Sequence, residues 1–344
     1  MKNINIEKIT KFLLNPLPQR SVDVLARRFG LLGNAKSTLD SVGKTYGITR
    51  ERVRQIEFCA LANIRANLLP KDQKCQNILD ILNKELNDCG QIVSEADFLG
   101  NIAPDNSEKQ NYIRFFLTLG GTFKKFKEDD AFFCRWSVAD HNKIEKVQAA
   151  LNALSKKLSV DDVFTEEEII DKFKEHSASL GFSSGLEKAH ICSWLRMSKN
   201  TARNSLGEWG LSYSPSIRPR GIRDYTYLIM RKHGSPMHFT EVSKAIQTNL
   251  GKPAHVQTVH NELIKDDRFV LVGRGLYALK EWGYMPGSVR DVMNKILKKE
   301  GPLSKLDLMK KVLKERHVRE STISINLQNR KFFKKLASDL YHVV

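Results

Sequence analysis

The chain lacks the features that would assign it to a membrane, secreted or zinc-binding class. Its 344 residues contain no run of 18 apolar residues, so we expect no membrane contact. The first 14 residues alternate polar and apolar side chains and have no unbroken apolar stretch of the signal-peptide kind, which favours a cytoplasmic protein. The five cysteines are scattered and form no C-x-x-C pair, which argues against a disulfide framework or a zinc ribbon.

Motifs of the common enzyme classes are also absent. We find no G-x-x-x-x-G-K-S/T, no H-E-x-x-H and no G-x-S-x-G. Paired aspartates occur at 129–130, 161–162 and 266–267, where we predict turns or helix ends with solvated carboxylates. We therefore expect a protein that is not an enzyme, with no cofactor, no metal site and no evident small-molecule substrate.

Acidic residues are scarce relative to basic ones. There are 39 against 56, which gives a net charge of +17 and indicates an anionic partner such as nucleic acid. The distribution is uneven, because residues 285–344 hold 14 basic and 6 acidic residues whereas residues 71–141 hold 9 basic and 12 acidic ones. Separate modules with different partners fit this pattern better than a uniform basic tail.

Four similar units follow one another from residue 71 onward. Each has an amphipathic helix, a second helix with a capping Ser or Thr, and a third helix. The predicted caps are Ser94, Thr165, Thr240 and Ser304, and the predicted third helices are 107–119, 198–209, 255–266 and 318–329. In the first, third and fourth units, short β-prone runs follow the third helix as a hairpin, and the second unit lacks a clear pattern there. We predict winged helix-turn-helix units at 71–141, 142–221, 222–284 and 285–344.

Residues 1–70 are predicted to be helical only. Gly47 supplies a turn and Thr49 caps the next helix. The inward positions of that helix are Val53, Ile56, Ala60, Leu61 and Ile64. Phe58 lies off this strip, and we expect it to pack under the preceding turn. The predicted fold class is mainly α, with an N-terminal helix-turn-helix domain followed by tandem winged helix-turn-helix units that carry short β-hairpins.

The stretch "GITRERVRQIEFCALANIR", residues 47–65, carries the first candidate site. Three arginines at the start of a helix oppose its dipole and call for a negative partner. The spacing of Arg50, Glu51, Arg54 and Gln55 puts them on one outward strip. In a helix-turn-helix this end of the second helix enters the major groove, where such side chains can bond guanine, cytosine and adenine.

We predict that these four residues read bases. The residues expected at the DNA phosphates are Thr38, Lys44, Thr49 and Arg52. The alternative is an arginine-rich face that is simply solvated.

The last unit carries a second, basic candidate surface. Its residues are Lys310, Lys311, Lys314, Arg316, Arg319, Arg330, Lys331, Lys334 and Lys335. Phosphate contacts here would add salt-sensitive affinity that does not depend on sequence. A solvated lysine surface is an equally good interpretation.

Residues 16–70 resemble region 4 of the sigma-70 family of transcription initiation factors. The segments "RFGL" and "STLDSVGKTYGITRERVRQIE" carry the resemblance. It implies that the helix with the four base-reading candidates recognises a promoter −35 element in double-stranded DNA. It also implies that the preceding helices dock on the flap of the RNA polymerase β subunit, in a cytoplasmic, nucleoid-associated protein.

A second resemblance covers residues 223–284, through "SPMHFTEVSKAIQ" and "DDRFVLVGRGLYALKEWGY". This segment is similar to HARE-HTH domains, winged helices that occur in the RNA polymerase δ subunit, in chromatin proteins and beside restriction nucleases. We expect a sequence-specific transcription factor of sigma-factor type whose winged helices contact DNA or RNA polymerase. Two alternatives are an RNA polymerase-associated subunit with little DNA specificity and a restriction/modification accessory that senses modified DNA.

Overall fold

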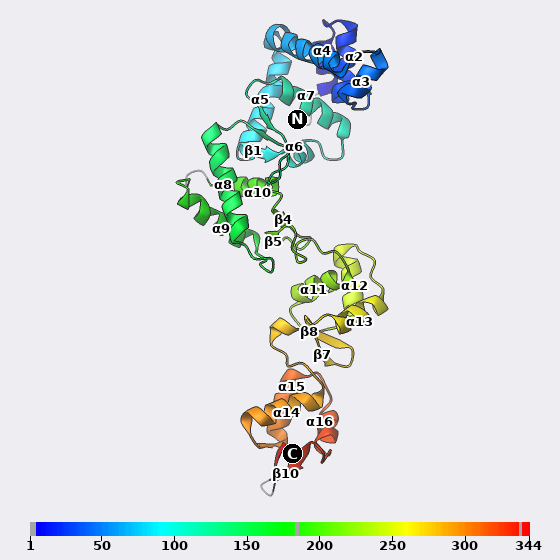
Figure 1. The fold of residues 1–344 in the computed structure, drawn as a ribbon, viewed down its shortest axis with the longest axis vertical. Coiled ribbons are helices and arrows are strands. Elements are labelled where there is room, and N and C mark those ends of the chain that lie inside the picture. The colour runs from blue at the N-terminus through cyan, green and yellow to red at the C-terminus, as the bar shows by residue number, and fades with distance from the viewer. Residues whose placement is uncertain (1–4, 183–185, 337–338) are drawn as a thin grey trace. The chain divides into compact units, whose positions relative to one another are not determined.

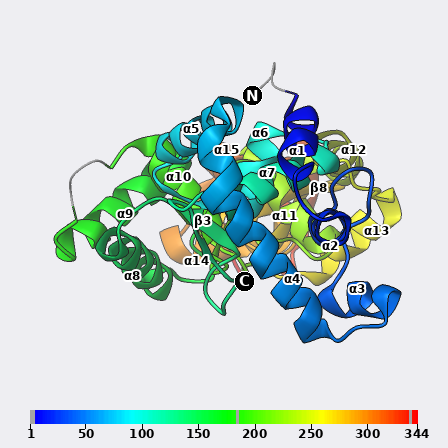
Figure 2. The same cartoon turned by 90° about the horizontal axis from the view of Figure 1, so that it is seen from above.

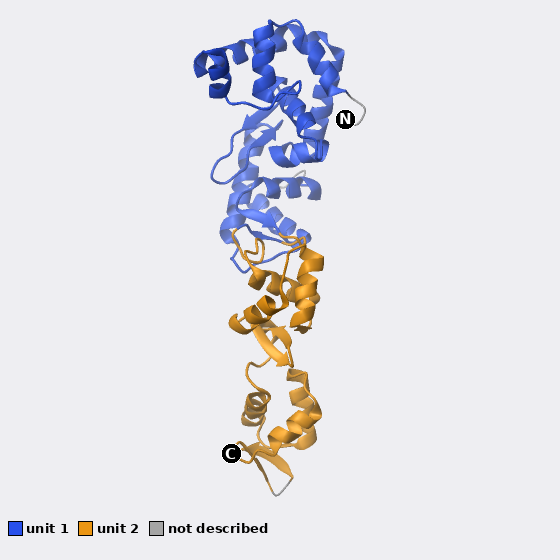
Figure 3. Ribbon diagram, turned by 90° about the vertical axis from the view of Figure 1, so that its right-hand side faces the viewer, with its two compact units in different colours: residues 1–203, 209–212 blue, residues 204–208, 213–344 orange. Residues whose placement is uncertain are grey.

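The computed structural model describes residues 5–182, 186–336 and 339–344 (Figure 1). The chain divides into two compact units, residues 1–203 with 209–212, and residues 204–208 with 213–344 (Figure 3). Helices dominate both units and the sheets are small and antiparallel, so the predicted mainly α fold class is confirmed. Over the described ranges, no helix is long and apolar enough to cross a membrane.

The described part of the chain begins with four helices, and the last of them leads toward the next segment without a loop. They are α1 (Ile6–Leu14), α2 (Gln19–Phe29), α3 (Leu39–Tyr46) and α4 (Arg50–Asn63). After α4 the helix passes through a π-helical turn at Ile64–Leu68 and a 3-10 turn at Leu69–Lys71. Figure 2 shows α3 beside one end of α4.

The next segment alternates helices with short strands. Its elements are α5 (Gln73–Asp88), β1 (Ile92–Ser94), α6 (Glu95–Ile102), α7 (Ser107–Leu119), β2 (Lys124–Phe126) and β3 (Arg135–Ser137). The strands form an antiparallel sheet in the order β1-β3-β2. The last strand therefore lies between the two earlier ones.

The same element order and sheet order occur twice in the second unit. The first copy is α11 (Ile222–His233), β6 (Met237–His238), α12 (Phe239–Leu250), α13 (Val256–Lys265), β7 (Phe269–Gly273) and β8 (Leu276–Leu279). The second copy is α14 (Val289–Glu300), β9 (Leu303–Ser304), α15 (Lys305–Glu315), α16 (Glu320–Leu327), β10 (Phe333–Lys335) and β11 (Leu340–Val343). In each sheet the last strand is again central, as in β6-β8-β7 and β10-β11-β9.

The segment before these copies, residues 141–211, differs from the prediction at one helix. It contains α8 (His141–Lys157), α9 (Glu166–Ser179), α10 (Lys188–Met197), β4 (Thr201–Arg203) and β5 (Trp209–Leu211). The third helix predicted at 198–209 is wrong, because these residues form the β4–β5 hairpin and α10 precedes them. Phe164 pairs with Trp209 and stands in the place of a first strand.

Three of the four predicted caps are confirmed and one is wrong. Ser94, Thr165 and Ser304 each accept a hydrogen bond from the backbone N–H three residues on. Thr240 lies inside α12, which is capped instead by His238. The Glu241 carboxylate accepts a bond from the His238 N–H. The capping box of α12 therefore pairs Glu241 with His238 and not with a threonine.

One hydrophobic core joins the N-terminal helices to the segment that follows them. The cluster contains Leu14, Leu25 and Ile64 together with Phe98 and Phe116, all nearly inaccessible to solvent. Phe29 at the end of α2 and Phe115 on α7 meet edge to face, with ring centroids 5.2 Å apart. The helix-turn-helix segment is therefore supported by α7.

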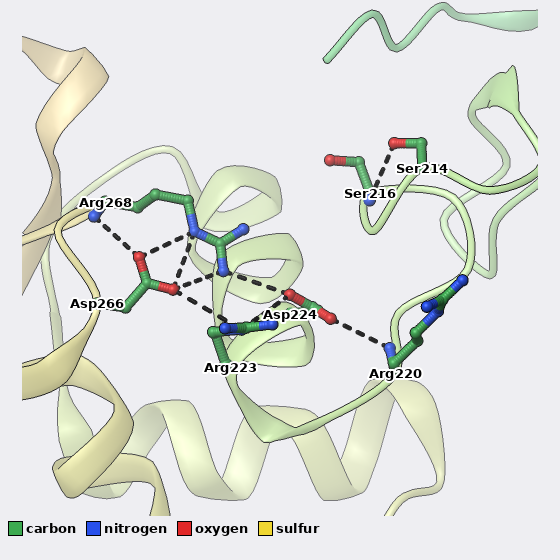
Figure 4. A network of polar contacts seen from close by, with 7 residues as sticks. All are labelled: Ser214, Ser216, Arg220, Arg223, Asp224, Asp266 and Arg268. Carbon is green, nitrogen blue, oxygen red and sulfur yellow. Dashed lines mark hydrogen bonds and ion pairs between the residues drawn. The ribbon is translucent and has the colours of Figure 1, made fainter. Parts of the chain in front are cut away.

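The second unit begins with a polar network at the start of α11 (Figure 4). The Asp224 carboxylate is buried and accepts bonds from the Arg268 guanidinium at 3.3 Å and from the Arg220 N–H at 3.1 Å. Arg268 also binds Asp266 at 2.7 Å. Burial acts to raise the pKa of Asp266, but the bonds from Arg268 hold it below its usual value. The network fastens α11 to the residues after α13.

Candidate nucleic-acid interface

Two capped helices and a left-handed glycine build the helix-turn-helix. The Thr38 hydroxyl accepts from the Ser41 N–H at 3.1 Å and starts α3. Gly47 ends α3 with a φ of +62°, a conformation that suits glycine. The Thr49 hydroxyl then accepts from the Arg52 N–H at 3.2 Å and starts α4. The predicted turn at Gly47 and the cap at Thr49 are confirmed.

A small separate core lies between α2, α3 and α4. Val24, Val42 and Val53 are buried there, with Ile56 partly buried against them. The other predicted inward residues of α4, Ala60, Leu61 and Ile64, are also buried. Phe58 was predicted to pack under the preceding turn, but its side chain is 63% exposed, so that prediction is wrong. Phe58 lies on the side of α4 that faces solvent, opposite the buried residues.

An ion pair that the sequence did not reveal fixes α4 against α2. The Arg28 Nε lies 2.8 Å from the Glu57 Oε2, and both side chains are largely buried. Arg28 also donates to the Ser37 carbonyl at 2.6 Å, which ties down the loop before α3. Arg28 is one of several arginines on α2, and its spacing did not distinguish it from them.

The four base-reading candidates are all exposed at the N-terminal end of α4. Arg54 donates two bonds to the Glu51 carboxylate, at 2.8 and 2.7 Å. These bonds lower the pKa of Glu51 and raise the pKa of Arg54. Gln55 accepts from Arg52 at 3.1 Å, and Arg50 lies 3.9 Å from Asp40. Solvent screens such exposed contacts, so a ligand can replace them.

The predicted phosphate residues flank this strip. Thr38 and Thr49 are exposed at the starts of α3 and α4, and Lys44 is exposed in the last turn of α3. Arg52 is exposed in the first turn of α4. The structure thus places the eight N-terminal candidates on α3 and α4 or at the caps of these helices, and their roles at DNA stay predictions.

The C-terminal basic surface contains one residue that does not belong to it. Arg316 is 2% exposed, and its guanidinium donates to the carbonyls of Met285, Gly287 and Glu315. Burial lowers its pKa. Because these carbonyls satisfy the charged group internally, Arg316 fastens α15 to the segment before α14 and cannot contact a phosphate.

The other members lie at or near the surface. Lys311 pairs with Glu300 at 2.7 Å, and Lys335 pairs with Asp339. The exposed members without such a pair among the described residues are Lys310, Lys314, Arg319, Arg330, Lys331 and Lys334.

Comparison with known proteins identifies the N-terminal segment. Residues 13–66 match the family "Sigma-70, region 4". Over 65 residues the chain is 43% identical to "RNA polymerase sigma factor RpoS" of Coxiella burnetii (strain RSA 493 / Nine Mile phase I). This match covers 19% of the chain and 18% of that relative, so the chain spans less than a fifth of the relative's length. The helix-turn-helix is a sigma-70 region 4 domain, whereas the HARE-HTH resemblance of residues 223–284 stays a prediction.

Proposed function

We propose that this protein is a sigma-factor-like DNA-binding transcription protein that recognises a promoter −35-like element with α4. One observation carries the proposal. Arg50, Glu51, Arg54 and Gln55 are exposed together at the N-terminal end of α4, the second helix of the helix-turn-helix in a sigma-70 region 4 domain. That end of the helix is the part that enters the major groove in helix-turn-helix proteins.

The chemistry of the strip supports base recognition. Arg50 and Arg54 can each donate two bonds to the O6 and N7 of guanine, and Gln55 can pair with adenine in the same way. Glu51 can accept from the N4 of cytosine. The mechanism is binding without catalysis, in the cytoplasm, and it needs neither a metal nor a cofactor.

The repeated units extend the proposal. Three of the four units, at 71–141, 222–284 and 285–344, share the order helix, strand, two helices and two strands with the last strand central, and this order supports a winged helix-turn-helix assignment. We assign them as tandem winged helices that contact more DNA or RNA polymerase. By analogy with region 4, the flap of the polymerase β subunit is the expected docking place of the N-terminal domain.

Selection from a random pool of duplexes with the full-length protein tests this proposal. We expect an enriched motif, and we expect Arg54→Ala to lose about 1–3 kcal/mol of discrimination against other sequences. Arg218→Ala is the matched control, because Arg218 is exposed and lies outside the helix-turn-helix. An R54A protein that discriminates as well as the parent would show that α4 does not read bases.

A groove on the first unit favours a second candidate, an RNA polymerase-associated subunit with little DNA specificity. The groove has a volume of about 700 Å³ and lies between α1 and the start of α5, next to Lys8 and Lys71. It exposes 71% of Phe12, an apolar surface typical of protein contacts. Under this alternative, Phe12→Ser would weaken binding to purified RNA polymerase, and duplex affinity would hardly change with salt.

A further inference from the structure

The third helix of the first repeated segment is covered on the side that would face DNA. Ile113, Phe115 and Phe116 on α7 are fully buried in the core that α7 shares with the region 4 helices. The Asn111 amide on α7 also donates to the Gly30 carbonyl at 3.2 Å. Because α1 and α2 pack against it, α7 cannot enter a DNA groove.

The third helix of the second segment is covered as well. Trp194 on α10 is fully buried, and its indole N–H donates to the Gly90 carbonyl at 3.3 Å. The β1 strand of the preceding segment packs against α10. In the first unit, therefore, the third helices serve as internal supports.

The third helix of the last segment is open. On α16, Ile325 is 66% exposed and Ser321 is exposed. The helix has eight residues and a length of about 12 Å, and the major groove of B-DNA is wide enough to admit the diameter of an α-helix. Arg319 lies immediately before it, and Arg330 follows shortly after its end. Exposed cations at both ends are placed to meet the two phosphate strands that border a groove.

Most carboxylates of this segment are already occupied. Asp291 and Asp307 bind the capping hydroxyls of Ser288 and Ser304. The other occupied carboxylates are Glu300, paired with Lys311, Asp339, paired with Lys335, and Glu315, which accepts from the Met285 N–H. Among the acidic residues that the structure describes between 285 and 344, only the Glu320 carboxylate has no hydrogen bond or ion pair. With 14 basic against 6 acidic residues, the segment keeps a net charge of 14 − 6 = +8, and five of its six carboxylates are already held by groups of the segment itself.

We propose that residues 285–344 form a second duplex-binding surface, which holds DNA phosphates irrespective of sequence with α16 facing the groove. The surface consists of Lys310, Lys314, Arg319, Arg330, Lys331 and Lys334. The exposed positions within α16 are Glu320, Ser321 and Ile325. None of them offers a pair of hydrogen-bond donors to a base edge, so the contact is to the backbone. α13 is also partly open, but residues 222–284 hold only 9 basic against 6 acidic residues. The inference does not require α4 to read bases.

Neutralising three lysines in the full-length protein tests the inference. The variant is Lys310→Gln, Lys314→Gln and Lys334→Gln, and the matched control is Lys84→Gln, Lys156→Gln and Lys244→Gln, which removes the same charge from exposed positions elsewhere. Affinity for a random-sequence duplex is measured by fluorescence anisotropy at several salt concentrations. Each lost phosphate contact lowers the slope of log K against log salt by about 0.9, so we expect a loss of about 2–3 for the variant and little for the control. Circular dichroism checks that both stay folded.

The outcomes separate this inference from the proposed function. An unchanged slope in the variant, or an equal loss in the control, overturns the inference, and in the first case an acidic protein surface becomes the better partner. Loss of the slope together with no selected motif supports the inference while the proposed base reading by α4 fails. A selected motif together with an unchanged slope supports base reading by α4 and overturns the inference about residues 285–344.

Discussion

The phenolic oxygen of Tyr112 on α7 accepts a hydrogen bond from the backbone N–H of Leu32, 3.0 Å away. Leu32 has a φ of +55°, a left-handed conformation that is unfavourable for leucine. Tyr112 is 2% exposed and reaches from the first repeated segment to the loop between α2 and α3. The loop that leads into the helix-turn-helix is therefore held from outside the region 4 domain.

Tyr112→Phe removes this bond and keeps the ring. We expect the free energy of unfolding to fall by about 1 kcal/mol, because the Leu32 N–H loses its partner. Chemical denaturation measures the change, with Tyr213→Phe as the control, since Tyr213 is 57% exposed. Equal stabilities of Y112F and the parent would show that the bond contributes nothing.

Two glycines of the helix-turn-helix should respond differently to alanine. At Gly47 an added Cβ meets nothing within 4 Å, so Gly47→Ala adds only the strain of a positive φ, about 1 kcal/mol. At Gly43, inside α3, the Cβ would lie 2.7 Å from the Ile48 carbonyl oxygen. This clash opposes the helix preference of alanine, which is about 1 kcal/mol. We expect Gly43→Ala to be the more destabilising change and to weaken duplex binding by shifting α3 against α4.

The comparison needs only unfolding free energies of the two variants. A Gly43→Ala protein more stable than the parent would mean that the α3–α4 corner relaxes freely around the new methyl group.

Glu95 should make the stability of the first unit depend on pH. Its carboxylate accepts from Arg114 at 3.0 Å, Lys125 at 2.7 Å and the Trp136 indole at 2.9 Å. Burial acts to raise the pKa of Glu95, but these bonds hold it below the usual value. Its stabilisation is therefore complete above the pKa of an unfolded glutamate, about 4.3, and is lost as pH falls through the lower folded value.

Glu95→Gln isolates this effect from other carboxylates. The parent should be more stable than E95Q by about 1–3 kcal/mol at neutral pH, because the two cations lose their charge partner. The difference should shrink well below about pH 4. Urea denaturation of both proteins at several pH values measures it, and a difference that does not change with pH would contradict the assignment.

Cysteine reactivity should report the exposure of α4. Cys59 is exposed on that helix, whereas Cys75 and Cys192 are buried. Burial raises the pKa of Cys75 to about 12, which suppresses its reactive thiolate. We expect Cys59 to react fastest with a thiol reagent in the native protein, and Cys59→Ser to remove that fast phase. A fast phase that persists in C59S would place another thiol at the surface.

The sequence predicts the helix-turn-helix well because local interactions specify it. A positive-φ glycine, a threonine cap and a 3.6-residue apolar pattern each act within a few residues, and Gly47, Thr49 and Val53 lie as these rules indicate. The outward strip follows directly, since polar side chains opposite a buried stripe have no other place to go.

Features that depend on long-range packing cannot be predicted from such local patterns. α10 is apolar on most sides because it is covered on most sides, so it lacks the one-sided pattern that marks a helix in sequence. Arg316 looks like its basic neighbours and differs only in the carbonyls that surround it in the fold. His238 replaces the expected threonine cap because Glu241 reaches its N–H.

The shared core of α7 and the region 4 helices sets a limit on modular exchange. In a region 4 segment excised at residue 70, the apolar side chains of Leu14, Leu25 and Ile64 would lose the cover of α7 and become exposed to solvent. Such a fragment should aggregate or loosen, and grafting it onto another protein should fail unless α7 is transferred with it. For protein engineering and for recombination between genes, the smallest transferable cassette of this chain extends past the helix-turn-helix and through Leu119.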